Sequence, residues 1–126
     1  MGKTTVTVCK SFPFDAAHHL PNYEGKCHQN HGHRWTLEVE VSGTVSKLSG
    51  FVIDFSFLKG LVKPLIDQLD HNDLNNILAN PTCENLLGYI WSNLESQLTL
   101  TEGIVCLSRL RLHETPDSFA EMKLGD

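Results

Sequence analysis

The segment HRWTLEVEVSGTV, residues 33–45, alternates between polar and apolar side chains over most of its length. Its apolar positions are Trp35, Leu37, Val39 and Val41. Successive side chains of a strand point to opposite faces, so this segment has one face for a core and one for water. The alternation predicts a half-buried antiparallel strand, and the rest of the chain has to cover its apolar face.

Four further segments have the features of strands. Residues 4–18 carry apolar side chains at roughly every second position, and residues 51–53 form a short apolar run after a turn at 46–50. Near the C-terminus, residues 103–114 and 118–124 flank a Thr-Pro-Asp turn, which predicts a strand and its antiparallel partner. Both ends of the chain are therefore expected to supply strands.

Between these strands the hydrophobic period changes to that of a helix. Residues 55–69 repeat apolar side chains at i, i+3, i+4 and i+7, which predicts an amphipathic helix. Pro64 lies inside this pattern and predicts a kink or a restart there. A second helix is expected over residues 82–98, where Pro81-Thr82 supplies the start signal.

The order of two strands, two helices and two strands predicts an α+β fold in a single domain, residues 1–126. We expect a four-stranded antiparallel sheet, in ββααββ order, with both helices on one face. The other face would then lack a cover. An uncovered sheet face favours association between copies of the chain, so we expect a homo-oligomer.

The composition excludes several classes of function. Ten Lys and Arg against fifteen Asp and Glu give a net charge of −5, and no basic stripe is present for nucleic acid or an anionic membrane. The apolar runs are far too short to span a bilayer, and the first residues lack a signal-peptide core. The irregular spacing of the four cysteines indicates free cytosolic thiols rather than a framework of disulfides. We therefore expect a cytoplasmic protein that binds neither nucleic acid nor membranes.

Five of the seven histidines lie between His18 and His33. On an extended chain His31 and His33 point the same way, and Gly32 between them leaves room for a ligand. By strand parity His18 shares the face of the apolar residues before it, whereas His19 shares the opposite, solvent face. Three histidines without a fourth protein ligand are typical of a catalytic zinc site with an open position. The pattern predicts Zn²⁺ on His18, His31 and His33.

Cys27 lies four residues before His31 and leaves two interpretations open. As a fourth ligand, it would close a structural zinc site. Beside a metal that lowers its thiol pKa, it could act instead as a base or a nucleophile. The spacing alone does not choose between these two roles.

Two more places carry groups suited to chemistry. Asp70 and His71 follow the first predicted helix; a carboxylate beside an imidazole can tune a proton-transfer group, although such a pair also caps helix ends. Glu114 ends the long C-terminal strand on the face of its apolar residues, which are Ile104, Cys106, Leu110 and Leu112. A carboxylate at the end of an apolar face either reaches solvent or is paired inside a pocket, where the adjacent N–H donors of a guanidine-like ring edge would suit it.

Five motifs follow one another along the chain: Phe14-Asp15-Ala16-Ala17-His18, Cys27-His28-Gln29-Asn30-His31-Gly32-His33, Leu69-Asp70-His71, Asn80-Pro81-Thr82-Cys83-Glu84-Asn85 and Glu114-Thr115. Together they resemble the 6-pyruvoyl-tetrahydropterin synthase family. The resemblance is greatest to its bacterial branch, the 6-carboxy-5,6,7,8-tetrahydropterin synthases of queuosine biosynthesis. It covers essentially the whole chain.

The resemblance implies the tunnelling fold, in which the sheets of several subunits join into a barrel, usually as a dimer of trimers. By analogy with the family, the three histidines hold Zn²⁺ and Cys27 abstracts protons as a catalytic residue rather than a ligand. Asp70 and His71 match the family's catalytic relay to that cysteine. In the relatives the cysteine and the Asp-His pair come from neighbouring subunits, so assembly would complete the site.

The resemblance also implies a substrate, 7,8-dihydroneopterin triphosphate. Conversion to 6-carboxytetrahydropterin would release acetaldehyde and triphosphate. Glu114 matches the family's glutamate that anchors the pterin ring in the catalytic site, and Thr82 and Glu84 match additional substrate contacts.

The short Cys-x3-His-Gly-His spacing, residues 27–33, favours the carboxy branch, because the animal pyruvoyl synthases carry a longer insert there. A 6-pyruvoyl-tetrahydropterin synthase, or another lyase such as an aldolase of the dihydroneopterin side chain, is the alternative within the same fold. A non-catalytic module is the alternative of another class. In that module Cys27 and the three histidines would close a structural zinc site, and the uncovered sheet face would bind a partner.

Overall fold

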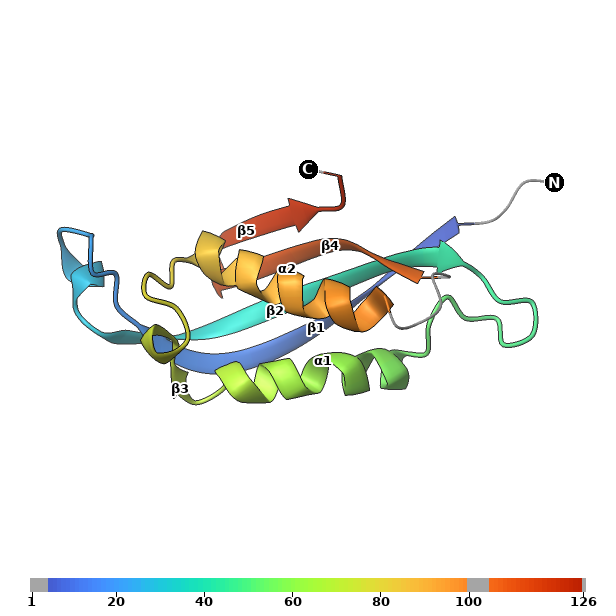
Figure 1. Ribbon diagram of the computed structural model, residues 1–126, viewed down its shortest axis with the longest axis horizontal. Helices are drawn as coiled ribbons and strands as arrows, with labels where there is room; N and C mark the ends of the chain where they lie inside the picture. The colour runs from blue at the N-terminus through green and yellow to red at the C-terminus, as the bar shows by residue number, and fades with distance from the viewer. Residues whose placement is uncertain (1–4, 100–104, 126) are drawn as a thin grey trace.

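The computed structural model describes residues 5–99 and 105–125 (Figure 1). In these ranges the regular elements are, in chain order, β1 (Thr5–His18), the short 3₁₀ helix η1 (Lys26–His28), β2 (His31–Thr44), α1 (Phe55–Leu69), β3 (Asn72–Asp73), the 3₁₀ helix η2 (Leu74–Asn76), α2 (Cys83–Thr99), β4 (Val105–Thr115) and β5 (Ser118–Lys123). The predicted α+β class, both long helices and the strands at either end of the chain are confirmed. Residue 4 and residues 103–104, which the sequence placed in strands, lie outside the described residues.

The sheet differs from the predicted four antiparallel strands, because it has five strands in the order β3-β1-β2-β4-β5 and is mixed. The additional strand, β3, pairs with β1 in parallel and interrupts the expected ββααββ order between the two helices. It forms because His71, with a left-handed φ of 57°, turns the chain after α1 back along β1. The His71 backbone N–H then donates to the Asp15 carbonyl at 2.6 Å. Two residues are too few for any hydrophobic period, so the sequence carried no signal for β3.

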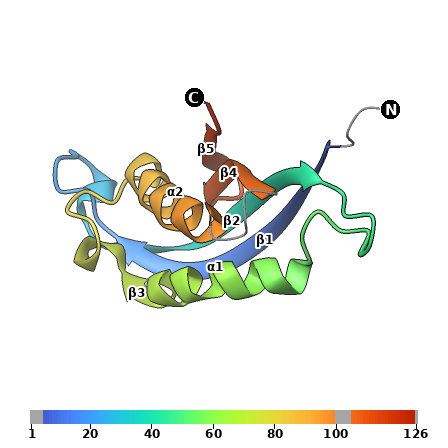
Figure 2. The same ribbon diagram turned by 45° about the vertical axis from the view of Figure 1, so that its right-hand side comes forward.

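The core lies between one face of the sheet and the two helices. Strand residues of a single parity enter it, among them Phe14 on β1, Trp35 and Leu37 on β2 and Leu112 on β4. Helix α1 lies along β1, and α2 lies over β4 and β5 (Figures 1 and 2). The apolar face of the strand at residues 33–45 is thus covered as the sequence required.

The other sheet face, called the open face below, carries polar and charged side chains, and within the described residues neither α1 nor α2 packs on it. Arg109 Nε donates to Glu40 Oε2 at 2.6 Å, and its Nη1 donates to Glu121 Oε1 at 3.1 Å. Arg111 also donates to Glu121, through Nη2 at 2.7 Å, and holds the pKa of that carboxyl below its ordinary value. These pairs cross β2, β4 and β5, so the charges of the open face are largely matched within one chain.

Helix α1 begins at Asp54, whose side chain accepts a hydrogen bond from the Ser56 N–H at 2.8 Å. The predicted kink or restart at Pro64 is not a restart, because one continuous helix includes this residue. Pro64 is exposed, so the hydrogen bond that proline cannot donate is missing on the solvent side, away from the core. None of the helices in the described residues is long and apolar enough to cross a membrane.

Two predictions about strands are wrong. Phe51, Val52 and Ile53 form no strand; the chain bends there, and Ile53 packs into the core instead of pairing. The second error concerns Cys106, which was predicted to share the apolar face of Leu110 and Leu112. Its side chain is exposed and lies on the opposite face of the sheet. The cause is a bulge: the register between β2 and β4 shifts at Glu40/Val41, which leaves one extra residue in β4 and inverts the parity on either side of it.

Candidate active site

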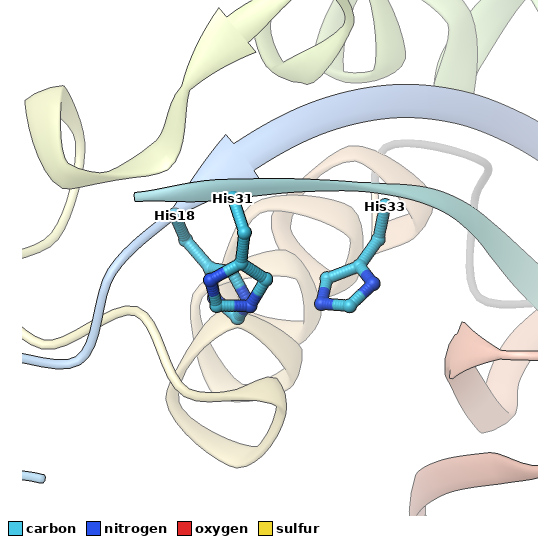
Figure 3. A group of neighbouring side chains, drawn as sticks. All are labelled: His18, His31 and His33. Carbon is cyan, nitrogen blue, oxygen red and sulfur yellow. The ribbon is translucent and has the colours of Figure 1, made fainter. Parts of the chain in front are cut away.

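Three imidazoles gather where β1 ends and β2 begins. In the antiparallel register His18 lies opposite His31, and Ala16 lies opposite His33, so the three side chains emerge on the same face. The ring centroids of His18 and His31 are 4.7 Å apart, those of His18 and His33 5.3 Å, and those of His31 and His33 4.7 Å. Figure 3 shows the three rings on one side of the strands. We call this group the histidine site.

Backbone carbonyls orient two of the three rings. His18 Nδ1 lies 2.8 Å from the carbonyl oxygen of Pro81, and His31 Nδ1 lies 2.8 Å from that of Gln29. If each Nδ1 carries the proton and donates it, each Nε2 has a lone pair free, which is the tautomer a metal ligand needs. The carbonyls therefore orient the two rings and favour the tautomer with its hydrogen on Nδ1.

His18 Nε2 is buried and makes no hydrogen bond in the structure. The whole His18 side chain is only 1% exposed, and Glu114 Oε1 lies 3.3 Å from Nε2 without hydrogen-bond geometry. A buried polar atom without a partner costs free energy, and an ion bound there would supply the partner. The residues present thus fit a metal.

The surroundings of the histidine site disfavour a proton on His33. Burial lowers the pKa of His33, and the neighbouring His31 and His18 lower it further, although Glu114 acts in the opposite direction. The ligand nitrogens of the three histidines all lie within 4.8 Å of one another. Among the described residues no fourth ligand joins them, and three histidine nitrogens are the donor set of a catalytic zinc site.

The structure places His18 on the core face, as strand parity predicts, and keeps His19 out of the group. It also keeps Cys27 out. Cys27 lies on η1, is half-buried, and does not join the three ligand nitrogens among the described residues. Within one chain, the thiol therefore does not complete the four-ligand set of a closed structural site.

Asp70 and His71 lie together at the edge of the sheet, beside β1. Asp70 Oδ1 accepts from the Asp15 backbone N–H at 2.8 Å, and its Oδ2 lies 3.0 Å from His71 Nδ1. The Asp15 N–H holds the pKa of Asp70 below its ordinary value, and His71 adds to this effect. The His71 ring is 80% exposed and lines a cleft with Asp15 and Arg34. The pair is pre-formed, but one chain does not bring it into the histidine site.

Glu114 lies at the end of β4, half-buried, and borders the histidine site. It lines a cleft of about 560 Å³ between the diverging ends of β2 and β4, with His33, Arg34 and Thr115 among its other walls. A carboxylate in the wall of such a cleft can accept two adjacent N–H donors of a flat ring.

The two other predicted contact residues lie at the start of α2. The Thr82 hydroxyl accepts from the Asn85 N–H at 3.0 Å and thus caps the helix. Glu84 is exposed in the first turn. The hydroxyl of Thr82 keeps its hydrogen free for a ligand, whereas Glu84 makes no contact with the histidine site.

Sequence reasoning missed the carbonyls of Pro81 and Gln29, because any residue can supply a carbonyl and only the folded chain shows where it points. It also gave no role to Cys83. This half-buried thiol donates to the Leu112 carbonyl at 3.3 Å, and burial, together with the nearby Glu114, raises its pKa to about 11. Cys83 therefore packs under the cleft as a protonated thiol.

Comparisons with known proteins agree with this geometry. The profile of the family described as 6-pyruvoyl tetrahydropterin synthase matches residues 7–124. The chain is 41% identical over 120 residues to the 6-carboxy-5,6,7,8-tetrahydropterin synthase of Synechocystis, covering 90% of this chain and 89% of the relative. It is 39% identical over 110 residues to the dihydroneopterin monophosphate aldolase of Pyrococcus furiosus, covering 87% and 90%.

The solved structure of the 6-pyruvoyl tetrahydropterin synthase of Caenorhabditis elegans has the same fold. It superposes with a TM-score of 0.86 at 27% identity, over 98% of this chain and 99% of that chain. The resemblance seen in the motifs therefore extends to the arrangement of the whole chain.

We expect Cys83 to be alkylated slowly in the folded protein. With a pKa of about 11, only about one Cys83 thiol in a thousand is ionised at pH 8, and the thiolate is the reactive form. Iodoacetamide at pH 8 should modify Cys83 about two orders of magnitude more slowly than in the urea-unfolded chain, as peptide mass spectrometry would measure. Equal rates in the folded and unfolded protein would contradict the buried, protonated thiol.

Proposed function

The chain belongs to the 6-pyruvoyl tetrahydropterin synthase family, and from that premise we propose that it is a zinc-dependent 6-carboxy-5,6,7,8-tetrahydropterin synthase. Its substrate would be 7,8-dihydroneopterin triphosphate. The reaction consumes water and gives 6-carboxytetrahydropterin, acetaldehyde and triphosphate, a step toward queuosine and related 7-deazaguanines. The observation that carries the proposal is the histidine site, where carbonyls aim two Nε2 lone pairs and His18 Nε2 is buried without a partner.

His18, His31 and His33 would hold Zn²⁺, since their ligand nitrogens lie within 4.8 Å of one another and burial disfavours a proton on His33. When bound, the zinc would supply Lewis-acid chemistry, polarising an oxygen of the substrate side chain and stabilising the negative charge that develops beside it. The carbonyls of Pro81 and Gln29 would keep the His18 and His31 rings in the binding tautomer.

Proton transfer is the proposed role of Cys27, Asp70 and His71. Cys27 would remove a proton from a carbon of the side chain and return one to a later intermediate. Asp70 already orients His71 through the 3.0 Å contact to Nδ1, which leaves His71 Nε2 exposed to exchange protons with the thiol. Elimination of triphosphate and cleavage of the carbon–carbon bond would follow from this proton abstraction.

Glu114 is proposed to recognise the pterin by accepting two N–H donors of the aminopyrimidinone edge. Its place in the cleft wall beside His18 and His33 supports this role, because the ring would then carry its side chain toward the histidine site. The Thr82 hydroxyl, next to Pro81, is proposed as a further ring contact. Glu84 would contact substrate only from its exposed position in the first turn of α2.

We further propose that the functional unit is a homo-oligomer, a dimer of trimers. Neither the Cys27 thiol nor the Asp70–His71 pair joins the histidine site within one chain. The open face, which has no helix cover, would line the inside of a barrel formed by adjoining sheets. A neighbouring chain would then bring its proton-transfer groups to the histidine site of the first.

A second function is favoured by one specific observation, the 39% identity to a dihydroneopterin monophosphate aldolase. An aldolase would cleave the same side chain but leave a hydroxymethyl group on the pterin. A pyruvoyl synthase would eliminate triphosphate and keep all three side-chain carbons. A closed structural zinc site is not favoured, because Cys27 lies outside the ligand group.

The deciding experiment incubates the zinc-loaded protein with 7,8-dihydroneopterin triphosphate and identifies the products by mass spectrometry. We expect 6-carboxytetrahydropterin and acetaldehyde in equal amounts. A 6-hydroxymethyl pterin with a two-carbon aldehyde would establish the aldolase instead, and a pyruvoyl pterin the pyruvoyl synthase. An unchanged triphosphate would contradict both synthases, and the same assay with 7,8-dihydroneopterin monophosphate tests the aldolase.

Zinc binding should depend on His18 and not on its neighbour His19. The His18→Ala variant should lose most of its zinc, because one of three ligands is removed. The His19→Ala variant should keep about one zinc per chain, and metal analysis by mass spectrometry compares the two. Zinc retained in the first variant and lost in the second would reverse the assignment.

Cys27→Ala should lower turnover by about two to four orders of magnitude, the usual effect of removing a general acid–base group, while the zinc content stays unchanged. His71→Ala should act in the same direction with a similar or smaller factor. The exposed Cys106 offers a matched control, and Cys106→Ala should retain turnover. Near-normal turnover of Cys27→Ala would remove the thiol from the mechanism.

Glu114→Gln should weaken pterin binding by about 2–4 kcal/mol, because an acceptor is replaced by a donor that faces another donor. Calorimetry with a non-reactive pterin and zinc-loaded protein would measure this difference. The zinc content should not change, since Glu114 does not belong to the group of proposed zinc ligands, His18, His31 and His33. Equal affinities of the variant and the wild type would place Glu114 outside the pterin site.

A further inference from the structure

The end of β1 has no strand partner on the side of β3 once the two-residue bridge has ended. β3 pairs only with Ala16 and Ala17, so the backbone that follows lacks a ladder there. The side chain of Asn75, on η2, takes the place of the missing strand. Its Oδ1 accepts from the His19 N–H at 2.9 Å, and its Nδ2 donates to the His19 carbonyl at 3.0 Å.

This pair of bonds has the donor and acceptor pattern of a peptide group in a sheet. An amide side chain provides a donor and an acceptor on two separate atoms, whereas a carboxylate only accepts and a hydroxyl has both functions on one atom. Asn75 is itself held in place, because its backbone N–H donates to Asp73 Oδ1 at 3.0 Å. The two hydrogen bonds of Asn75 therefore connect η2 to the backbone at the end of β1.

His18 directly precedes the residue that Asn75 holds, and it is the most deeply buried member of the histidine site. Its ring is fixed from one side by the Pro81 carbonyl at Nδ1, and its backbone by β2 through the His18–His31 pair. The Asn75 contact adds the remaining constraint, on the backbone immediately after the ring. Three attachments from three segments thus determine where His18 Nε2 points.

We propose that Asn75 is a positioning residue of the histidine site. Its two hydrogen bonds to the His19 backbone replace those of a neighbouring strand and hold the His18 ring with its ligand nitrogen close to those of His31 and His33. The inference rests on the proposed metal site. Outer groups that orient a metal ligand typically change metal affinity by 10–100-fold when they are removed.

The test is zinc affinity, measured by competition with a chromophoric chelator on the purified full chain. Asn75→Ala should raise the Kd about tenfold or more. Asn75→Asp, which keeps the acceptor for the His19 N–H but opposes the carbonyl with a second oxygen, should also bind more weakly than the wild type. The side chain of the neighbouring Asn76 donates to Asn72 Oδ1 at 3.4 Å, does not contact His19 among the described residues, and is the matched control. Asn76→Ala and Asn76→Asp should bind zinc as the wild type does.

A second readout separates positioning from a general loss of stability. In the Co²⁺-substituted protein, the visible d–d bands report the geometry of the ligands. We expect them to shift in both Asn75 variants and to stay unchanged in both Asn76 variants. A merely structural Asn75 would lower the melting temperature of the metal-free protein without moving the bands of its folded Co²⁺ form. If Asn75→Ala does not fold, the conservative Asn75→Asp variant decides.

The outcomes distinguish this inference from the function on which it rests. A wild-type protein that binds no zinc overturns the metal site, and the positioning role with it. A wild-type protein that binds zinc, together with Asn75 variants of equal affinity and identical Co²⁺ spectrum, overturns the positioning role alone. Weaker binding and shifted bands confined to the Asn75 variants support it.

Discussion

The antiparallel register between β1 and β2 is the constraint on which the rest of the molecule depends. By pairing His18 with His31 and Ala16 with His33, it puts three imidazoles on the face that is otherwise occupied by core residues. The same register aligns Phe14 with Trp35, whose stacked rings form the core immediately next to these histidines. A slip of one residue would put the β1 side chains His18 and Phe14 on the opposite face from their β2 partners. Packing and chemistry therefore depend on one alignment of two strands.

That arrangement buries His18 Nε2 at the end of an apolar strand face, and three neighbouring segments supply polar groups that orient the histidines or the backbone beside them. The loop before α2 supplies the Pro81 carbonyl, the turn before β2 supplies the Gln29 carbonyl, and η2 supplies the Asn75 amide. None of these three groups titrates. These three contacts thus do not depend on a proton gained or lost by the Pro81, Gln29 or Asn75 groups, and the groups proposed to move protons lie farther out, on η1 and after α1.

The sequence was sufficient wherever a hydrophobic period ran for many residues. The strands at 4–18 and 33–45, both helices, and the inward direction of His18 followed from periodicity alone, and the family motifs led to the fold. Short or irregular features escaped: β3 has two residues, Ile53 packs into the core without pairing, and the bulge in β4 inverted the expected face of Cys106. The roles of backbone carbonyls escaped as well, since they leave no trace in residue type. The separation of Cys27 and His71 from the histidine site is set by tertiary structure, which no local pattern encodes.

The bulge in β4 has a consequence for how the chain tolerates changes of length. Its extra residue, Ser108, stands between Leu107 and Arg109, which pair with consecutive residues of β2, and its hydroxyl donates to the Glu40 carbonyl at 3.2 Å. Deleting Ser108 would leave every other side chain of β4 on its present face, with Glu114 still beside His18. Deleting a residue elsewhere in the strand would exchange the faces of all residues between that point and the bulge. Among single deletions in β4, that of Ser108 is therefore the one that leaves all remaining side chains of the strand on their present faces.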